Sequence, residues 1–257
     1  MFDKPVIEEY LKKVDDPLPF YIDIGCSTNS SITSSRAERS DTTVFFERGI
    51  DKAGKYAARE WARLPQFRII TKSVSPSNIG DLLRTCTDRT DPTFVDLDID
   101  GYDYFILEAL LREYTPALIC CEINEKIPPP IKFTVKYNPK YHWDVSHFYG
   151  MSITKLEELL TKYGYNIINL TLNNVYAAAS TCKALAEEPI YTAKEAYEKF
   201  YVNDDRRTGV FRHNKDMEPL LHCTPEEGIK FLKEKFAGKR SGPAGAELPE
   251  YEYELGL

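Results

Sequence analysis

The stretch TFVDLDIDGYDYF, residues 93–105, places a carboxylate at every second position of an apolar run and then ends in a turn. Side chains alternate between the two faces of a strand, so Asp96, Asp98 and Asp100 share one side for as long as the strand lasts. Three carboxylates this close repel one another and cannot all be buried in ionised form at low cost. They therefore require a cation, protons, or an end-of-strand position that is open to solvent.

Short apolar runs alternate with helical patterns on both sides of this stretch. The predicted strands are residues 20–25, 42–47, 67–74, 93–100, 116–124 and 166–179, the last of these a single strand or a strand pair. The predicted helices are residues 5–14, 51–64, 75–86, 102–114 and 152–165. This alternation predicts an α/β fold with a Rossmann-like, doubly wound and mostly parallel sheet between two layers of helices.

Two segments depart from the alternation. Residues 126–150 form a connection that is longer than most loops without a function. We therefore expect this insertion to cover a bound acceptor molecule. Its residues Tyr141, Trp143 and Tyr149 would offer flat faces to a sugar or aromatic ring. Residues 181–257 are predicted as a helical C-terminal extension and tail, packed on a domain of residues 1–180 and contributing no chemical group.

Composition excludes several classes of protein. The 257 residues carry a formal net charge of −7. The sequence does not indicate a basic face of the kind that nucleic-acid-binding proteins use. No run approaches the ~20 apolar residues of a membrane span, and the N-terminus has no apolar signal core. The six cysteines form no CxxC pair, which argues against structural zinc and for free thiols in the cytoplasm. The sequence does not indicate an oligomeric state.

Polar residues follow five of the predicted strands at their carboxyl ends, where open α/β sheets bind ligands. Gly25 allows a sharp turn into a loop with exposed hydroxyl and amide groups. Glu47 ends the second strand, where an acid can bind both hydroxyls of a ribose. The residues at these strand ends are Asp23, Gly25 and Ser27, then Glu47, then Ser73 and Val74, then Asp98 and Asp100, and finally Glu122 and Asn124.

The fourth and fifth strand ends also supply metal-type ligands. Carboxylates from Asp98 and Glu122 and the amide oxygen of Asn124 suit Mg²⁺, or Ca²⁺ or Mn²⁺, rather than zinc. We interpret Asp96 as structural. Asp100 and His147 are the candidate proton acceptors.

The order of these segments resembles class I S-adenosylmethionine-dependent methyltransferases, closest to the branch of FkbM-type sugar and natural-product O-methyltransferases. The resemblance covers residues 20–180 through YIDIG, VFFE, KSV, DIDGYDYFILEAL, ALICCEIN and HFYGMSITKLEELLTKYGY. The usual second glycine of the cofactor loop is absent. The family implies S-adenosylmethionine bound by Asp23, Gly25, Ser27, Glu47, Ser73, Val74 and Asp98. It also implies methylation of a hydroxyl on a small molecule, sugar or glycan.

DIDGYDY is also similar to the metal-binding segment of catechol-type O-methyltransferases. That similarity implies Asp98 as a ligand of Mg²⁺ or Mn²⁺, with Glu122 and Asn124 in place of an adjacent Asp-Asn pair. Here Ile123 separates the two residues.

Two other interpretations stay open. DIDGY resembles the Asp-x-Asp segment of haloacid-dehalogenase phosphatases, with Asp98 as nucleophile, although Tyr102 replaces their usual Thr and their nucleophile lies on an early strand. A non-catalytic nucleotide-binding domain is the third interpretation.

Overall fold

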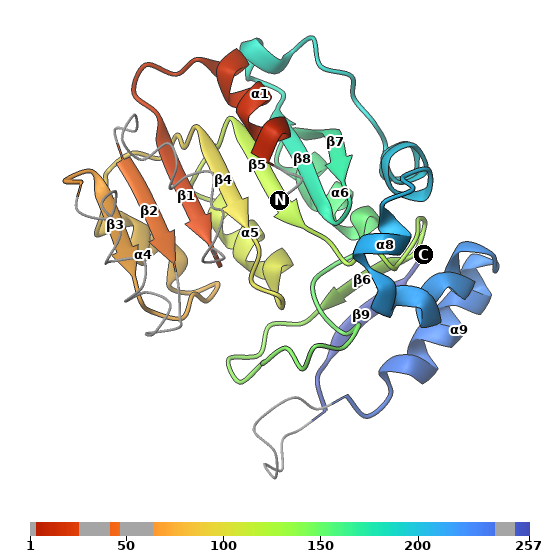
Figure 1. The fold of residues 1–257 in the computed structure, drawn as a ribbon. Coiled ribbons are helices and arrows are strands. Elements are labelled where there is room, and N and C mark those ends of the chain that lie inside the picture. The colour runs from red at the N-terminus through yellow and green to blue at the C-terminus, as the bar shows by residue number, and fades with distance from the viewer. Residues whose placement is uncertain (1–3, 26–41, 47–63, 240–249) are drawn as a thin grey trace. The chain divides into compact units, whose positions relative to one another are not determined.

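A computed structural model describes residues 4–25, 42–46, 64–239 and 250–257. Its larger sheet has seven strands in the order β3-β2-β1-β4-β5-β8-β7 (Figure 1). The predicted helices at the N-terminus and before β7 are confirmed, whereas the helix predicted over 51–64 lies outside the described residues. The strands of this sheet are β1 (Phe20–Ile24), β2 (Thr42–Phe46), β3 (Phe67–Ile70), β4 (Phe94–Leu97), β5 (Leu118–Glu122), β7 (Tyr165–Thr171) and β8 (Asn174–Ala179).

The sheet is mostly parallel, as predicted. Strands β1 to β5 pair in parallel through β2–β3, β1–β2, β1–β4 and β4–β5. Strand β8 runs the other way, because Ala179 bonds to Ala117 while Ile123 bonds to Asn173. The strand order reverses between β1 and β4, and this is the point at which doubly wound sheets bind ligands.

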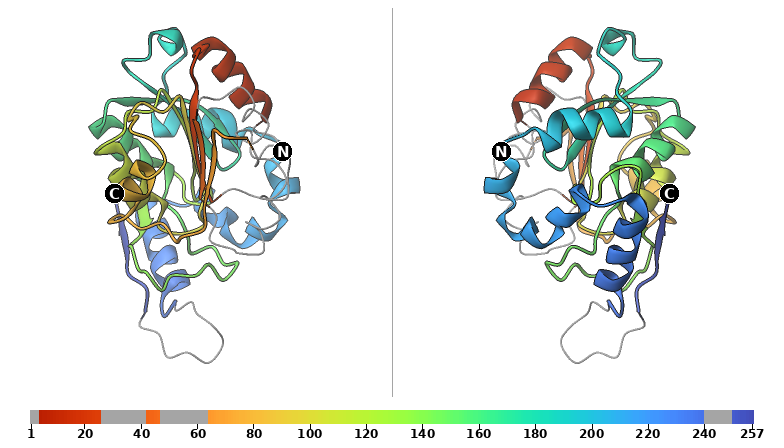
Figure 2. Two further views of the ribbon diagram at one scale, coloured as in Figure 1. Left: turned by 90° about the vertical axis from the view of Figure 1, so that its left-hand side faces the viewer. Right: turned by 90° about the vertical axis from the view of Figure 1, so that its right-hand side faces the viewer.

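Helices of several types connect and follow the strands. Helices α1 and α5 lie on opposite sides of the neighbouring strands (Figure 2). Among the described residues, no helix combines the length and the apolar character needed to cross a membrane. The helices are α1 (Lys4–Val14), α4 (Ile79–Arg84), α5 (Asp103–Leu111), α6 (Ile153–Lys162), η3 (Lys183–Leu185), α7 (Ala193–Ala196), the π-helix η4 (Tyr197–Val202), α8 (Arg207–Val210), η5 (Arg212–Leu221) and α9 (Pro225–Phe236).

Local sequence signals account for where the longer helices begin. Ser152 accepts a hydrogen bond from the backbone of Lys155 and so caps α6. Thr224 and Glu227 form a reciprocal capping box at the start of α9, with Pro225 in its first turn. These caps satisfy amide groups that have no partner within the helix.

The chain forms two compact units that interleave along the sequence. The first unit comprises residues 1–99, 106–121 and 176–189, and the second comprises 100–105, 122–175 and 190–257. A domain boundary at residue 180 stays a prediction.

In the first unit, the strands β1 and β4 meet closely at Gly25. This residue has a φ of +89°, and a Cβ built on it would lie 1.8 Å from the carbonyl oxygen of Asp98. The Gly25 amide donates to the carbonyl of Phe46, and the Asp98 amide donates to that of Ile24. Any side chain at position 25 would force these backbones apart, so the turn after β1 requires glycine.

The second unit contains a small antiparallel sheet that sequence reasoning missed. Strand β6 (Lys132–Val135) pairs with β9 (Tyr253–Gly256), and Lys132 lies opposite Gly256. Phe133 packs against Phe148, Phe236 and Tyr253 in an aromatic core. The end of the chain is therefore part of the core of this unit and not a simple helical tail.

We predict that deletion of residues 250–257 destabilises the second unit by at least ~3 kcal/mol, because it removes Tyr251, which is 3% exposed, together with a whole strand. Urea unfolding followed by tryptophan fluorescence would measure the loss. Deletion of Leu257 alone, which is 52% exposed, is the control and should change little. Unchanged stability after the longer deletion would show that β9 is dispensable.

Candidate functional site

The first unit holds the described residues of the predicted cofactor site. Asp23 is buried in β1, and Asp98 is exposed directly after β4. Ser73 is exposed and Val74 buried after β3, where the carbonyl of Ser73 accepts a hydrogen bond from Asn78. The predicted residues Ser27 and Glu47 lie outside the described residues.

In the second unit, the acids predicted at two strand ends come together. Carboxylate oxygens of Asp100 and Glu122 lie within 4.8 Å of each other, and we call these two residues the acidic group. Glu122 is 7% exposed and accepts a 2.6 Å hydrogen bond from Asn173. Like charges at such distances favour the binding of a cation or a proton.

The backbone at Asp100 explains how the acids are presented. Asp100 has a φ of +54°, a left-handed conformation that aspartate tolerates better than most residues. The strand ends before it, at Leu97, and the side chain of Asp103 accepts a hydrogen bond from the amide of Gly101 as α5 begins. Asp98 and Asp100 therefore lie beyond the strand, in the turn that leads into this helix.

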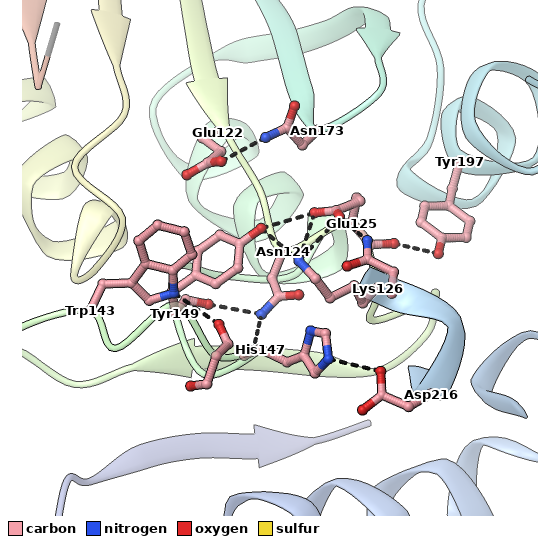
Figure 3. A network of polar contacts seen from close by, with 12 residues as sticks. Glu122, Asn124, Glu125, Lys126, Trp143, His147, Tyr149, Asn173, Tyr197 and Asp216 are labelled. Carbon is pink, nitrogen blue, oxygen red and sulfur yellow. Dashed lines mark hydrogen bonds and ion pairs between the residues drawn. The ribbon is translucent and has the colours of Figure 1, made fainter. Parts of the chain in front are cut away.

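Asn124 is completely buried and has one fixed orientation (Figure 3). Its amide nitrogen donates to the backbone carbonyls of His147, at 2.8 Å, and Tyr149, at 2.9 Å. Its amide oxygen has no hydrogen-bond partner within the described parts of the chain. This oxygen is an acceptor that a ligand, a water molecule or a metal ion could satisfy.

Sequence reasoning missed the buried ion pair that follows. Glu125 and Lys126 have side chains that are 1% and 2% exposed, with the Lys126 nitrogen 3.1 Å from the nearer carboxylate oxygen. Lys126 also donates to the Tyr149 hydroxyl at 2.7 Å, and that hydroxyl donates to Glu125 at 3.0 Å. The hydroxyl of Tyr197, in the π-helix, donates to the carbonyl of Glu125. The sequence signal that could have indicated this pair is an acidic and a basic residue placed between the apolar run at 118–122 and the three prolines at 128–130.

The aromatic residues of the insertion play different roles from those predicted. Tyr141 and Tyr149 are buried, and the Tyr141 hydroxyl donates to the carbonyl of Phe148. Burial, followed by the charges of Glu125 and Glu122, raises the pKa of Tyr149 well above its usual value, so its hydroxyl stays protonated. Only Trp143 of the three is partly exposed, and it packs edge-on against Tyr149.

The charges that act most strongly on His147 are those of Asp216, Lys126 and Lys235. Its Nε2 atom lies 2.9 Å from a carboxylate oxygen of Asp216, which follows in η5. Burial lowers the pKa of His147, the Asp216 charge opposes that effect, and the charges of Lys126 and Lys235 lower the pKa further.

Comparison with known proteins identifies no family. No protein-family model matches the sequence, and no curated protein matches it.

Several solved structures of methyltransferases are weakly similar to part of this chain. Magnesium protoporphyrin IX methyltransferase from Synechocystis, with bound S-adenosylhomocysteine, is 11% identical over 69% of this chain and 83% of its own, with a TM-score of 0.45. An S-adenosylmethionine-dependent methyltransferase from Clostridium acetobutylicum is 9% identical over 70% and 92%, also at 0.45. The methyltransferase domain of bacterial CtHen1 is 13% identical over 68% and 95%, at 0.44. At such low similarity, the fold assignment rests on the strand order of this chain itself.

We predict that Lys126→Met destabilises the protein by ~3–5 kcal/mol, because it leaves the Glu125 carboxylate buried without its cation. Urea unfolding would measure the change. The matched control is Lys194→Met, which removes an exposed ion pair with Glu198 and should have little effect. Equal losses in the two variants would contradict a special role for the buried pair.

Proposed function

We propose that the protein is an S-adenosylmethionine-dependent O-methyltransferase that acts on a hydroxyl of a sugar or glycan. The supporting observation is the reversal of strand order between β1 and β4, with Gly25 at the end of one strand and Asp98 beyond the end of the other. Doubly wound sheets bind nucleotide-type cofactors at this position. Asp100 follows two residues after Asp98 and, together with Glu122, would supply carboxylates for the acceptor.

The proposed cofactor residues are Asp23, Gly25, Ser27, Glu47, Ser73, Val74 and Asp98. Asp98 fits this role because it is exposed and lies directly beyond the end of β4. Residues 1–180 would form the catalytic domain, with the insertion at 126–150 over the acceptor and residues 181–257 packed as its extension.

When bound, the cofactor supplies an electrophilic methyl group for in-line transfer to the acceptor oxygen. The protein must hold the acceptor at near-attack distance and take up the hydroxyl proton. Asp100 and His147 are the proposed bases. We favour Asp100, because Glu122 lies beside it and a second carboxylate favours proton uptake, whereas His147 is hydrogen-bonded to Asp216.

We further propose that a divalent cation, Mg²⁺ or Mn²⁺, assists the reaction. Asp98, Glu122 and Asn124 would hold it through oxygen atoms, and the Asn124 amide oxygen has no partner among the described residues. These donors are the ones that both ions prefer. A cation there would hold the acceptor hydroxyl and lower its pKa.

We predict that S-adenosylhomocysteine binds the protein and that Glu47→Ala weakens binding by ~1–3 kcal/mol, because charge-assisted hydrogen bonds to the ribose are lost. Isothermal titration calorimetry measures the affinity, and Glu234→Ala, an exposed change in α9, is the control. Absence of binding, with stabilisation by beryllofluoride instead, would support the phosphatase interpretation with Asp98 as nucleophile. A screen of glycans for methyl transfer, with and without EDTA, would then identify the acceptor.

We predict that Asp98→Asn abolishes methyl transfer while leaving stability in EDTA unchanged or higher, because one member of a repelling carboxylate group loses its charge. The variant should also gain less thermal stability from Mg²⁺ than the parent does. Melting temperature against Mg²⁺ concentration, measured for both proteins, tests this. Equal responses to the metal would reject the metal site and leave Asp98 at most a metal-free base.

A further inference from the structure

A hydrogen-bonded path leads from the C-terminal segment of the second unit to the buried ion pair of Glu125 and Lys126. Asn214, in η5, is 3% exposed, and its amide nitrogen donates to one carboxylate oxygen of Glu125 at 2.6 Å. The other oxygen of Glu125 accepts from the Tyr149 hydroxyl. Lys126 donates to Glu125 itself and to the Tyr149 hydroxyl, so the buried carboxylate is neutralised and held by three residues.

The same path continues through the backbone to Asn124 (Figure 3). Tyr149 is anchored by its hydroxyl, and its backbone carbonyl accepts one N–H of the Asn124 amide. The carbonyl of His147 accepts the other. A displacement of Tyr149 would move the carbonyl that orients Asn124, so the two ends of the path are mechanically connected.

The amide oxygen of Asn124 gives this path a functional meaning. It is buried and has no partner in the described ranges of the chain, although nearly all buried polar atoms in native proteins have one. Asn124 lies two positions after Glu122 in the sequence, and Glu122 is a member of the acidic group. Because both amide protons are engaged by carbonyls, rotation that would satisfy the oxygen elsewhere is blocked.

We propose that Asn214 is a positioning residue for the acceptor site. Through Glu125 and Tyr149 it fixes the amide of Asn124, which keeps the amide oxygen available to a hydrogen-bond donor or a cation bound beside Glu122. An amide suits this position because it donates to Glu125 without adding a charge to a buried pair that is already neutral. The proposal rests on the proposed function for the reaction, but the orientation of Asn124 can be measured without cofactor.

The test is the hydrogen exchange of the Asn124 side-chain amide, followed by ¹⁵N NMR in the full-length protein. Asn214→Leu should lower the protection of these protons on the order of tenfold and shift their resonances, because the link to Glu125 is lost. The matched control is Asn203→Leu, an exposed change in the same segment that removes a hydrogen bond to the carbonyl of Glu198. It should leave the Asn124 signals unchanged.

A second variant separates positioning from folding. Tyr149→Phe removes only the hydroxyl link and should reproduce the effect on Asn124, and the double variant with Asn214→Leu should be no worse than the more affected single variant. If Asn214→Leu does not fold, Asn214→Ala, which removes the same hydrogen bond to Glu125 without added bulk, is measured in its place. Unchanged Asn124 signals in a folded variant would overturn the proposal, whatever its melting temperature. Binding of S-adenosylhomocysteine, measured separately, distinguishes this failure from a failure of the proposed function.

Discussion

The contact between Gly25 and the carbonyl of Asp98 is the constraint on which the first unit depends. It lets β1 and β4 lie side by side up to the point where each strand ends. Because the strand order reverses there, connections leave in opposite directions and the carboxyl ends stay open. A side chain at this glycine would change the spacing of two backbones, and no adjustment of other side chains could compensate for it.

The second unit depends on a different kind of interaction. Its charged residues Glu125 and Lys126 are removed from water almost completely, which is costly unless the geometry and the remaining hydrogen bonds are satisfied. Tyr149, Tyr197 and Asn214 satisfy them. Because these partners come from the insertion and from the C-terminal segment, the ion pair joins three stretches of this unit that are distant in the sequence.

The sheet could be predicted from the sequence because its strands are apolar runs separated by helical patterns, and this alternation is visible in the local sequence even though the strands form only by pairing with one another. The meeting of Asp100 and Glu122 followed from the rule that parallel strands end at a common edge. The pairing of β6 with β9 was missed although both segments, IKFTVKY at 131–137 and YEYELGL at 251–257, alternate apolar and polar residues as strands do. Local pattern alone does not say that two segments so far apart in the chain pair with each other. The buried roles of Tyr141 and Tyr149 were missed for a related reason, because they depend on partners such as Phe148 and Glu125 whose positions only the tertiary structure defines.

The pairing of Lys132 with Gly256 also has a consequence for how the second unit folds. The two strands lie far apart in the chain, so the loop between them must close before their contacts can form, and that closure costs conformational entropy. Proteins dominated by such distant contacts fold slowly. The aromatic core around Phe133 includes residues of this last strand and is therefore complete only when the strand has docked. Until then its apolar surface is exposed, which makes the partly folded chain prone to aggregation.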